Sequence, residues 1–160
     1  VYKIASQGVA DGAITDADTS YQVAKQFVEQ GRAGKKAKAG FYDYPDGAPK
    51  QLWPGLATVF PRADQQPTVD EVKTRLLYRQ AIEAVRCFEE GVVRTKLDAD
   101  LGSILGWGFP AYTGGAVSFV DFVGVETFVN TCDRLADQYG ERFRPTDALR
   151  KRITESLAIA

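Results

Sequence analysis

The sequence contains no histidine in its 160 residues, and its only cysteines are Cys87 and Cys132. Without histidine the chain cannot form a Ser-His-Asp or Cys-His triad, and it has no imidazole to bind a metal. Two thiolates alone do not complete a four-ligand zinc site. Two cysteines also make no disulfide framework. We therefore expect no metal site, and we expect a reducing compartment such as the cytoplasm.

An excess of positive charge, long apolar runs and methionine are also absent. The formal net charge is −1, so no global positive field favours binding to nucleic acid. No apolar run approaches the roughly 20 residues of a membrane span, and no basic-then-apolar signal pattern opens the chain. Methionine is missing even at position 1, where the chain begins Val-Tyr-Lys. We expect a piece of a longer protein that neither binds nucleic acid nor spans a membrane.

What the sequence does contain is helical periodicity, which is strongest in residues 68–90. Apolar residues recur there on one helix face: Val72, Leu76, Leu77, Ala81, Ala84, Val85 and Phe88. Thr68 and Glu71 form a capping-box pattern, in which the hydroxyl accepts from the amide of residue 71 and the carboxylate reaches back to the amide of residue 68. Further helices are predicted over 99–105, 116–123, 126–139 and 145–156. No strand alternation is sustained, so the predicted fold class is all-α.

The N-terminal third is less regular. Residues 1–19 predict a loop that holds at most one helical turn. A short helix follows, with Thr19 or Ser20 as its N-cap and Gly31 at its end. A loop rich in glycine and lysine then leads to Gly40 and to the aromatic residues that follow it.

Five of the seven prolines lie in residues 45–67, which therefore cannot form a long helix or a central strand. Pro45-Asp46-Gly47 predicts a turn, and Leu56–Phe60 predicts one helical turn. The segment is too apolar for a free linker. We expect an extended strap whose Trp53 and Phe60 pack on the domain that follows.

An ordered set of motifs runs through residues 75–124. It comprises RLLYRQAIEAVRCFEEG at 75–91, Asp98-Ala-Asp100, Gly106-Trp-Gly-Phe-Pro110, Gly114-Gly115, and Asp121 with Gly124. With these motifs, residues 68–124 resemble the C-terminal helical domain of the 3-hydroxyacyl-CoA dehydrogenase family. Residues 31–44, which end Gly40-Phe-Tyr-Asp-Tyr44, are similar to the close of a preceding copy of that domain. One departure is that Lys38 stands where the family's Lys-x-Gly-x-Gly pattern has its first glycine.

Two such segments in tandem resemble the multifunctional enzymes of fatty-acid β-oxidation. In that family an enoyl-CoA hydratase domain precedes an NAD-binding Rossmann domain and two helical C-terminal domains. The resemblance implies that residues 1–44 are the tail of the first helical domain, forming an irregular N-terminal arm. Residues 45–67 are then the strap, and residues 68–160 are the second helical domain.

The resemblance also implies that catalysis and cofactor binding lie in other domains of the parent enzyme. The parent enzyme would oxidise 3-hydroxyacyl-CoA to 3-ketoacyl-CoA with NAD, and the family's catalytic His-Glu pair lies upstream of this region. The present chain has no histidine and no G-x-G-x-x-G fingerprint, so we expect no catalytic residue and no cofactor-binding residue in it. We expect a structural module that packs against neighbouring domains and self-associates. The alternative is a stand-alone helical binding module.

Two loops are candidate ligand sites. Lys35, Lys36 and Lys38 lie among glycines and could contact the phosphates of coenzyme A, or they could form a solvated surface loop. The loop 106–115 could bind an anion through its glycine amides. The other reading of that loop is packing, in which Trp107, Phe109 and Tyr112 fill the core and the glycines allow helices to approach closely.

Overall fold

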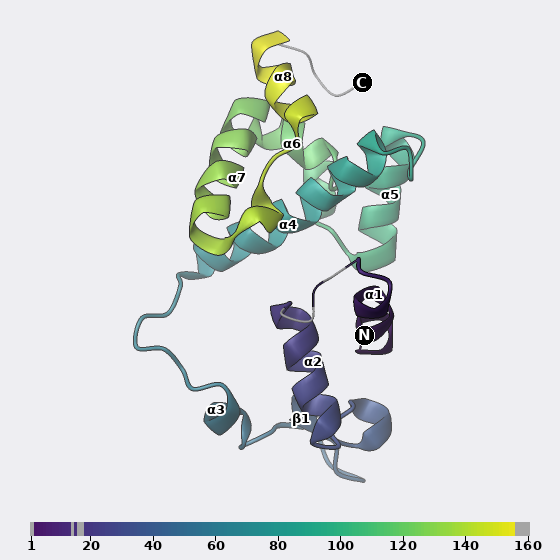
Figure 1. Ribbon diagram of the computed structural model, residues 1–160, viewed down its shortest axis with the longest axis vertical. Helices are drawn as coiled ribbons and strands as arrows, with labels where there is room; N and C mark the ends of the chain where they lie inside the picture. Colours follow the sequence, from purple (N-terminus) through teal and green to yellow (C-terminus); the bar gives the residue numbers. More distant parts are fainter. Residues whose placement is uncertain (1, 14, 16–17, 156–160) are drawn as a thin grey trace. The chain divides into compact units, whose positions relative to one another are not determined.

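The computed structural model describes residues 2–13, 15 and 18–155, and the chain divides into two units, residues 1–66 and 67–160 (Figure 1). The first unit contains α1 (Tyr2–Ala10), α2 (Thr19–Glu29), the 3₁₀ turn η1 (Lys35–Ala37), β1 (Tyr42–Asp43), β2 (Gln51–Leu52) and α3 (Leu56–Val59). The second contains α4 (Val69–Glu89), α5 (Lys96–Trp107), η2 (Ala111–Thr113), α6 (Ser118–Val123), α7 (Val125–Tyr139), η3 (Glu141–Phe143) and α8 (Asp147–Glu155). Within the described residues, the only sheet is the antiparallel pair β1–β2, so the all-α class is confirmed.

The N-terminal segment is more helical than predicted. Tyr2–Ala10 form α1, where a loop was expected, because the partly buried positions 2, 5, 6 and 9 have helical spacing and Tyr2 stacks on Tyr21 of α2 at 5.9 Å. Part of the predicted loop, at positions 1, 14 and 16–17, lies outside the described residues. The N-cap of α2 is Asp18 instead of Thr19 or Ser20, since its carboxylate accepts from the amides of residues 20 and 21.

The first unit has a small aromatic core around Phe27. The rings of Phe41, Trp53 and Phe60 lie 4.3, 5.9 and 6.0 Å from the Phe27 ring. Trp53 and Phe60 therefore pack on the preceding helix α2, whereas the sequence predicted that they pack on the following domain. The expected turn at 45–47 and the helical turn near residue 56 are present, the latter as α3.

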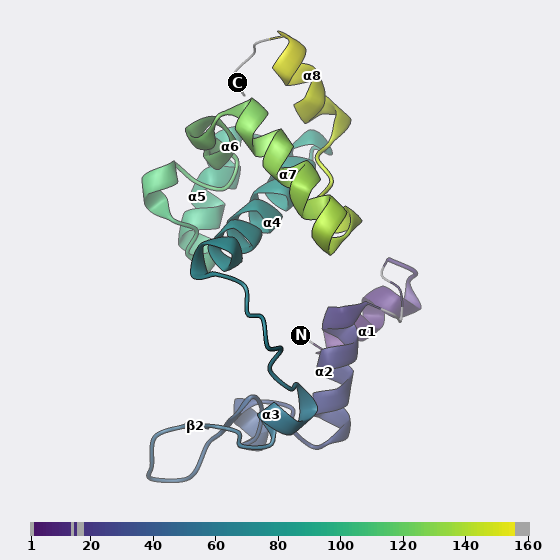
Figure 2. The ribbon, with the colours of Figure 1, turned by 90° about the vertical axis from the view of Figure 1, so that its left-hand side faces the viewer.

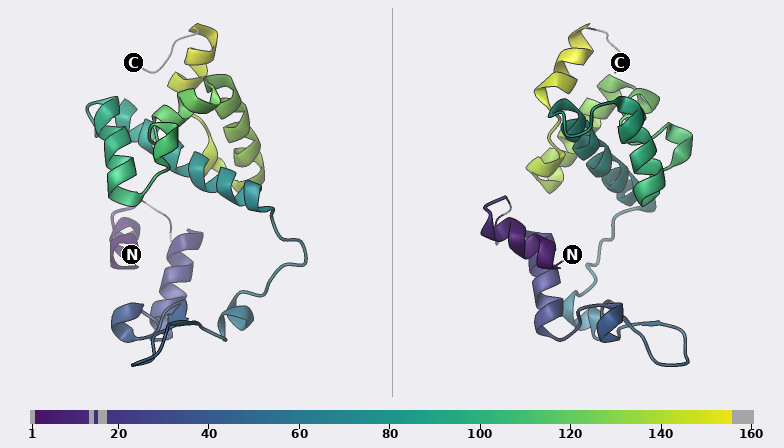
Figure 3. Two further views of the ribbon diagram at one scale, coloured as in Figure 1. Left: turned by 180° about the vertical axis from the view of Figure 1, so that it is seen from behind. Right: turned by 90° about the vertical axis from the view of Figure 1, so that its right-hand side faces the viewer.

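The second unit has the larger core, centred on α4, α6 and α7 (Figure 2). Tyr78 of α4 stacks on Phe128 of α7 at 4.9 Å, and its ring meets Phe119 of α6 edge-on at 5.2 Å. Phe109 packs against Phe119 at 5.9 Å. Helix α5 lies on the opposite side of the unit from α7 (Figure 3).

Two sequence expectations for the second unit need correction. Thr68 caps α4 by accepting from the Glu71 amide, but the Glu71 carboxylate accepts from both terminal guanidinium nitrogens of Arg134 on α7, at 3.1 Å each. Half of the capping box is thus replaced by a contact between helices. Of the three aromatic residues in the loop 106–115, only Phe109 fills the core, because Trp107 and Tyr112 are exposed. The predicted end of the last helix, Ser156, lies outside the described residues.

Candidate functional site

The lysine loop is closed by its own backbone. The Gly34 amide donates to the Ala39 carbonyl at 2.7 Å, and η1 lies between these two residues. A Cβ on Gly40 would lie 3.1 Å from the Gly34 Cα. The two ends of the loop are therefore too close together for a side chain to fit easily at position 40. The Arg32 guanidinium donates to the Gly40 carbonyl at 2.8 Å and covers the Trp53 ring at 4.0 Å, which fixes the loop to the aromatic core.

The structure regroups the three predicted lysines. Lys35 and Lys38 line one open hollow of about 480 Å³, whereas Lys36 is not part of its lining. Lys50 joins them, and the sequence analysis missed it. The antiparallel pairing of Asp43 with Gln51 brings the chain back toward the lysine loop after the turn. The position of Lys50 directly before β2 was therefore the signal that could have identified this residue.

Charge in this hollow is only partly compensated. Lys38 forms an ion pair with Asp46, whose carboxylate also lines the hollow. Within the described part of the chain, Lys35, Lys36 and Lys50 have no carboxylate within 4 Å. The arrangement therefore presents ammonium groups to solvent, which can attract an anion.

Lys38 adopts the left-handed backbone conformation, with φ at 56°, and is the only described non-glycine residue with a positive φ. This is the position at which the resembled family has glycine. In this chain, the lysine at that position adopts a backbone conformation that glycine reaches without strain.

In the second unit, the amides of Gly114 and Gly115 donate to the Ala111 carbonyl and the Thr113 hydroxyl, and a buried aspartate lies against the amides that follow the loop 106–115. The Asp100 side chain accepts from the amides of Val117 and Ser118 at 2.9 and 3.0 Å, and from the Ser118 hydroxyl at 2.6 Å. A Cβ on Gly115 would lie 2.4 Å from the Asp100 Cβ, so only glycine fits beside it. The chain's own carboxylate thus satisfies the start of α6. Close packing explains Gly115, whereas Gly108 has open space around it and adopts a positive φ of 77° at the end of α5.

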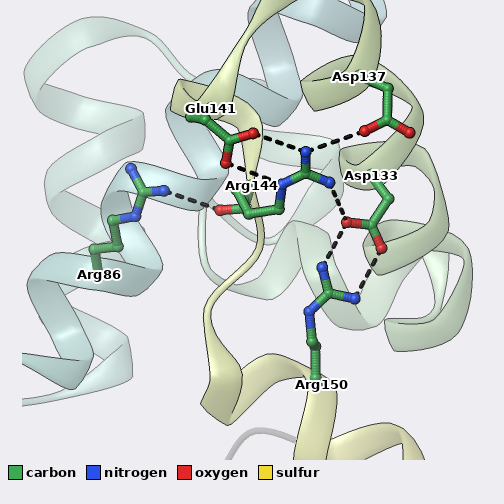
Figure 4. Close-up of polar contacts among 6 residues, drawn as sticks. All are labelled: Arg86, Asp133, Asp137, Glu141, Arg144 and Arg150. Carbon is green, nitrogen blue, oxygen red and sulfur yellow. Dashed lines mark hydrogen bonds and ion pairs between the residues drawn. The ribbon is translucent and has the colours of Figure 1, made fainter.

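A network of arginines and acids joins α4, α7, η3 and α8 (Figure 4). Asp133 accepts from Arg150 at 2.8 and 2.5 Å and from Arg144 at 3.1 Å. Arg144 also contacts Asp137 and Glu141, and its carbonyl accepts from Arg86 at 2.9 Å. Hydrogen bonds from Arg150 and then Arg144 hold the pKa of Asp133 below its usual range, although burial opposes this shift.

We expect Asp133→Asn to lower the free energy of unfolding by about 1–2 kcal/mol at pH 7, because it removes the charge from these hydrogen bonds. The folded-state pKa of Asp133 is depressed, so this stabilisation is present above the unfolded value of about 3.9 and is lost as the pH falls through the folded value. Urea unfolding at pH 7 and pH 2.5 measures the effect. Asp137→Asn is the control, with an expected change within about 0.5 kcal/mol. An Asp133→Asn effect of equal size at both pH values would contradict the assignment.

The two cysteines show no sign of activation. Cys132 is fully buried, and this burial raises the pKa of its thiol to about 12. Cys87 is half-buried on α4. Among the described residues, no group of three or more Cys, Asp and Glu side chains could hold a metal ion. The described helices include none that is long and apolar enough to cross a membrane.

Comparison with curated proteins finds alpha subunits of bacterial fatty acid oxidation complexes. The chain is 38% identical over 122 residues to the fatty acid oxidation complex subunit alpha of Shewanella loihica. It is 33% identical to the corresponding subunits of Vibrio cholerae, over 123 residues, and Vibrio vulnificus, over 129 residues.

These alignments cover 74%, 76% and 80% of this chain but only 17%, 17% and 18% of the three relatives. The chain therefore spans less than a fifth of the length of the curated relatives it matches. No family model matches the sequence. The relatives agree with the resemblance carried by residues 31–44 and 68–124, and we identify the chain as a homologue of one part of the fatty acid oxidation complex subunit alpha, a multifunctional enzyme.

Proposed function

We propose that this chain is a helical, non-catalytic part of a β-oxidation enzyme that oxidises 3-hydroxyacyl-CoA to 3-ketoacyl-CoA with NAD in a reducing compartment such as the cytoplasm. The observation that carries the proposal is the identity of 33–38% to subunits of fatty acid oxidation complexes over three quarters of the chain. NAD binding and acid-base catalysis belong to other parts of the longer protein. The loop with Lys35, Lys36 and Lys38 contributes a contact to the phosphates of coenzyme A.

Within this proposal, residues 1–44 close the first helical domain, residues 45–67 are the strap, and residues 68–160 form the second helical domain. The end of the first compact unit at Gln66 supports the start of the second domain near Thr68. The chemistry of the second unit supports a structural role, because Asp100 and Asp133 are held by internal hydrogen bonds and the Cys132 thiol is buried. These groups stabilise helix contacts and face no substrate.

We expect the chain alone to show no turnover of a 3-ketoacyl-CoA with NADH. The matched test replaces the aligned segment of the Shewanella loihica subunit with this chain. The chimera should retain 3-hydroxyacyl-CoA dehydrogenase activity, and a deletion of the same segment should lose it. Activity of the isolated chain, or an inactive but folded chimera, would contradict the proposal, and the latter would favour a stand-alone binding module.

The second unit exposes an apolar surface that suits domain packing. We call it the α5–α6 patch, and it consists of Leu97, Leu101, Leu105, Trp107, Tyr112 and Phe122. The three leucines recur every four residues on one face of α5, and Leu105 is 81% exposed. Trp107 borders an apolar hollow of about 390 Å³ between α4 and α5. Large exposed apolar patches on soluble proteins tend to mark sites where partners bind.

We expect the isolated chain to self-associate through the α5–α6 patch, because a two-fold pair lets the same apolar surface meet itself. Sedimentation equilibrium at micromolar concentration should show dimers for the wild type and monomers for Leu105→Asp. Leu52→Asp is the control, since Leu52 is an exposed leucine of the first unit and its replacement should leave the dimer intact. A monomeric wild type, or equal effects of both substitutions, would contradict this interface.

A further inference from the structure

A second hollow of about 480 Å³ lies in the first unit beside the lysine-lined one. Five aromatic residues contribute to its wall, together with Arg32 and aliphatic residues or glycines: Tyr2, Phe27, Phe41, Tyr42 and Tyr44. Phe41 is 49% exposed even though its ring packs on Phe27. The Phe41 ring is therefore held in place by the core and remains accessible.

The aromatic and the lysine-lined hollows adjoin. Tyr44 lines both of them, and Lys50 of the lysine-lined hollow places its ammonium group 4.7 Å from the Tyr42 ring centroid. A ligand in the aromatic hollow would therefore extend past Tyr44 toward Lys35 and Lys50. The two hollows share Tyr44 as a wall residue, and one of them is lined by aromatic rings while the other is lined by lysines.

The cationic end carries a local excess of positive charge. Residues 31–50 contain Arg32, Lys35, Lys36, Lys38 and Lys50 but only two acids, Asp43 and Asp46. Each acid is already engaged, Asp43 by Arg32 and Asp46 by Lys38. The excess is local to residues 31–50, since the whole chain has a formal net charge of −1, and Lys35 and Lys50 bring part of it to the hollow. It complements a compact anion with more than one negative charge.

We propose that the two hollows form one binding site for a nucleoside phosphate. The heteroaromatic base stacks in the aromatic hollow against Phe41, Tyr42 or Tyr44, and the phosphates lie against the ammonium groups of Lys35 and Lys50. Aromatic side chains stack on any flat base, and lysine binds phosphate as a point charge. The inference rests on the proposed function in one respect, because coenzyme A carries a nucleoside phosphate. The nucleotide end of coenzyme A is the part of that ligand that this site would bind.

The test uses the whole chain with ADP, adenosine and inorganic pyrophosphate as probes. Isothermal titration should give a Kd for ADP of roughly 0.1–1 mM, with weaker binding of adenosine and of pyrophosphate because each makes only half of the contacts. Amide chemical shifts should move within residues 32–50. The double variant Lys35→Glu/Lys50→Glu should weaken ADP binding at least tenfold and leave adenosine binding unchanged, whereas Tyr44→Ala should weaken both.

The matched control is Lys73→Glu/Lys151→Glu, which makes the same charge change at two exposed lysines of the second unit. This control should bind ADP like the wild type. The proposal is overturned if ADP leaves residues 32–50 unshifted, if pyrophosphate binds as tightly as ADP, or if the control loses as much affinity as the site variant. ADP binding and the activity of the chimera are separate measurements, so failure of this site leaves the β-oxidation proposal standing, and the reverse also holds.

Discussion

Replacing Asp100 with alanine is expected to destabilise the second unit by about 2–4 kcal/mol, because hydrogen bonds to a charged acceptor are lost and the amides that donated them are left unsatisfied. Asp100 is 6% exposed and accepts three hydrogen bonds from the start of α6. Its loss leaves the amides of Val117 and Ser118 without their acceptor. It also removes a negative charge from a helix N-terminus, where the helix dipole favours one.

The two tryptophans make this effect measurable in one unit at a time, because Trp53 lies in the first unit and Trp107 in the second. In a Trp53→Phe background, the fluorescence of Trp107 reports unfolding of the second unit in urea. Asp98→Ala is the matched control. It lies on the same helix, but its side chain is exposed and accepts from the Thr95 hydroxyl, so its loss should have an effect of about 1 kcal/mol or less. Equal losses at positions 98 and 100 would refute the capping role of Asp100.

Phe109→Ala is expected to destabilise the same unit by about 3–5 kcal/mol, as truncation of a buried aromatic side chain does. The Phe109 ring is 3% exposed and packs edge-on against Phe119, which in turn contacts Tyr78 and Phe128. The cavity therefore opens within a continuous aromatic cluster, which can close only by moving helices.

Two control variants are compared with Phe109→Ala. Phe122→Ala removes the same atoms from a ring that is 58% exposed, and Lys36→Ala alters an exposed position of the first unit. Lys36→Ala should stay within about 0.5 kcal/mol of the wild type, and Phe122→Ala should cost far less than Phe109→Ala. The Trp107 signal in urea gives the comparison for the second unit. Indistinguishable midpoints for Phe109→Ala and Phe122→Ala would mean that the core lies elsewhere.

The helices of the second unit were predictable because their cues are local. The long helix begins at the expected cap, Thr68, and the glycines at 91, 124 and 140 mark the ends of α4, α6 and α7. Helix α1 was not predicted because its stability depends on packing against α2. Short helices with few apolar positions need such contacts with other parts of the fold. The exposure of Trp107 and Tyr112 was missed for a related reason, since burial depends on what packs against a ring.

The candidate site was predictable only in part. The sequence marked Lys35 and Lys38, but pairing of β1 with β2 was needed to bring Lys50 beside them. Likewise, the motif Asp98-Ala-Asp100 does not show that its second acid turns inward to the amides of residues 117 and 118. Contacts between residues far apart in the chain decide these roles, and a single sequence carries no direct signal of them.

The left-handed backbone at Lys38 restricts which residues this position can accommodate. Glycine adopts this conformation freely, and asparagine and aspartate tolerate it better than other residues. None of these three carries a positive charge. The position can therefore have either an unstrained backbone or a cation opposite Asp46, and in this chain it has the cation. A positive charge at this position therefore comes with a backbone conformation that the lysine adopts less easily than glycine would.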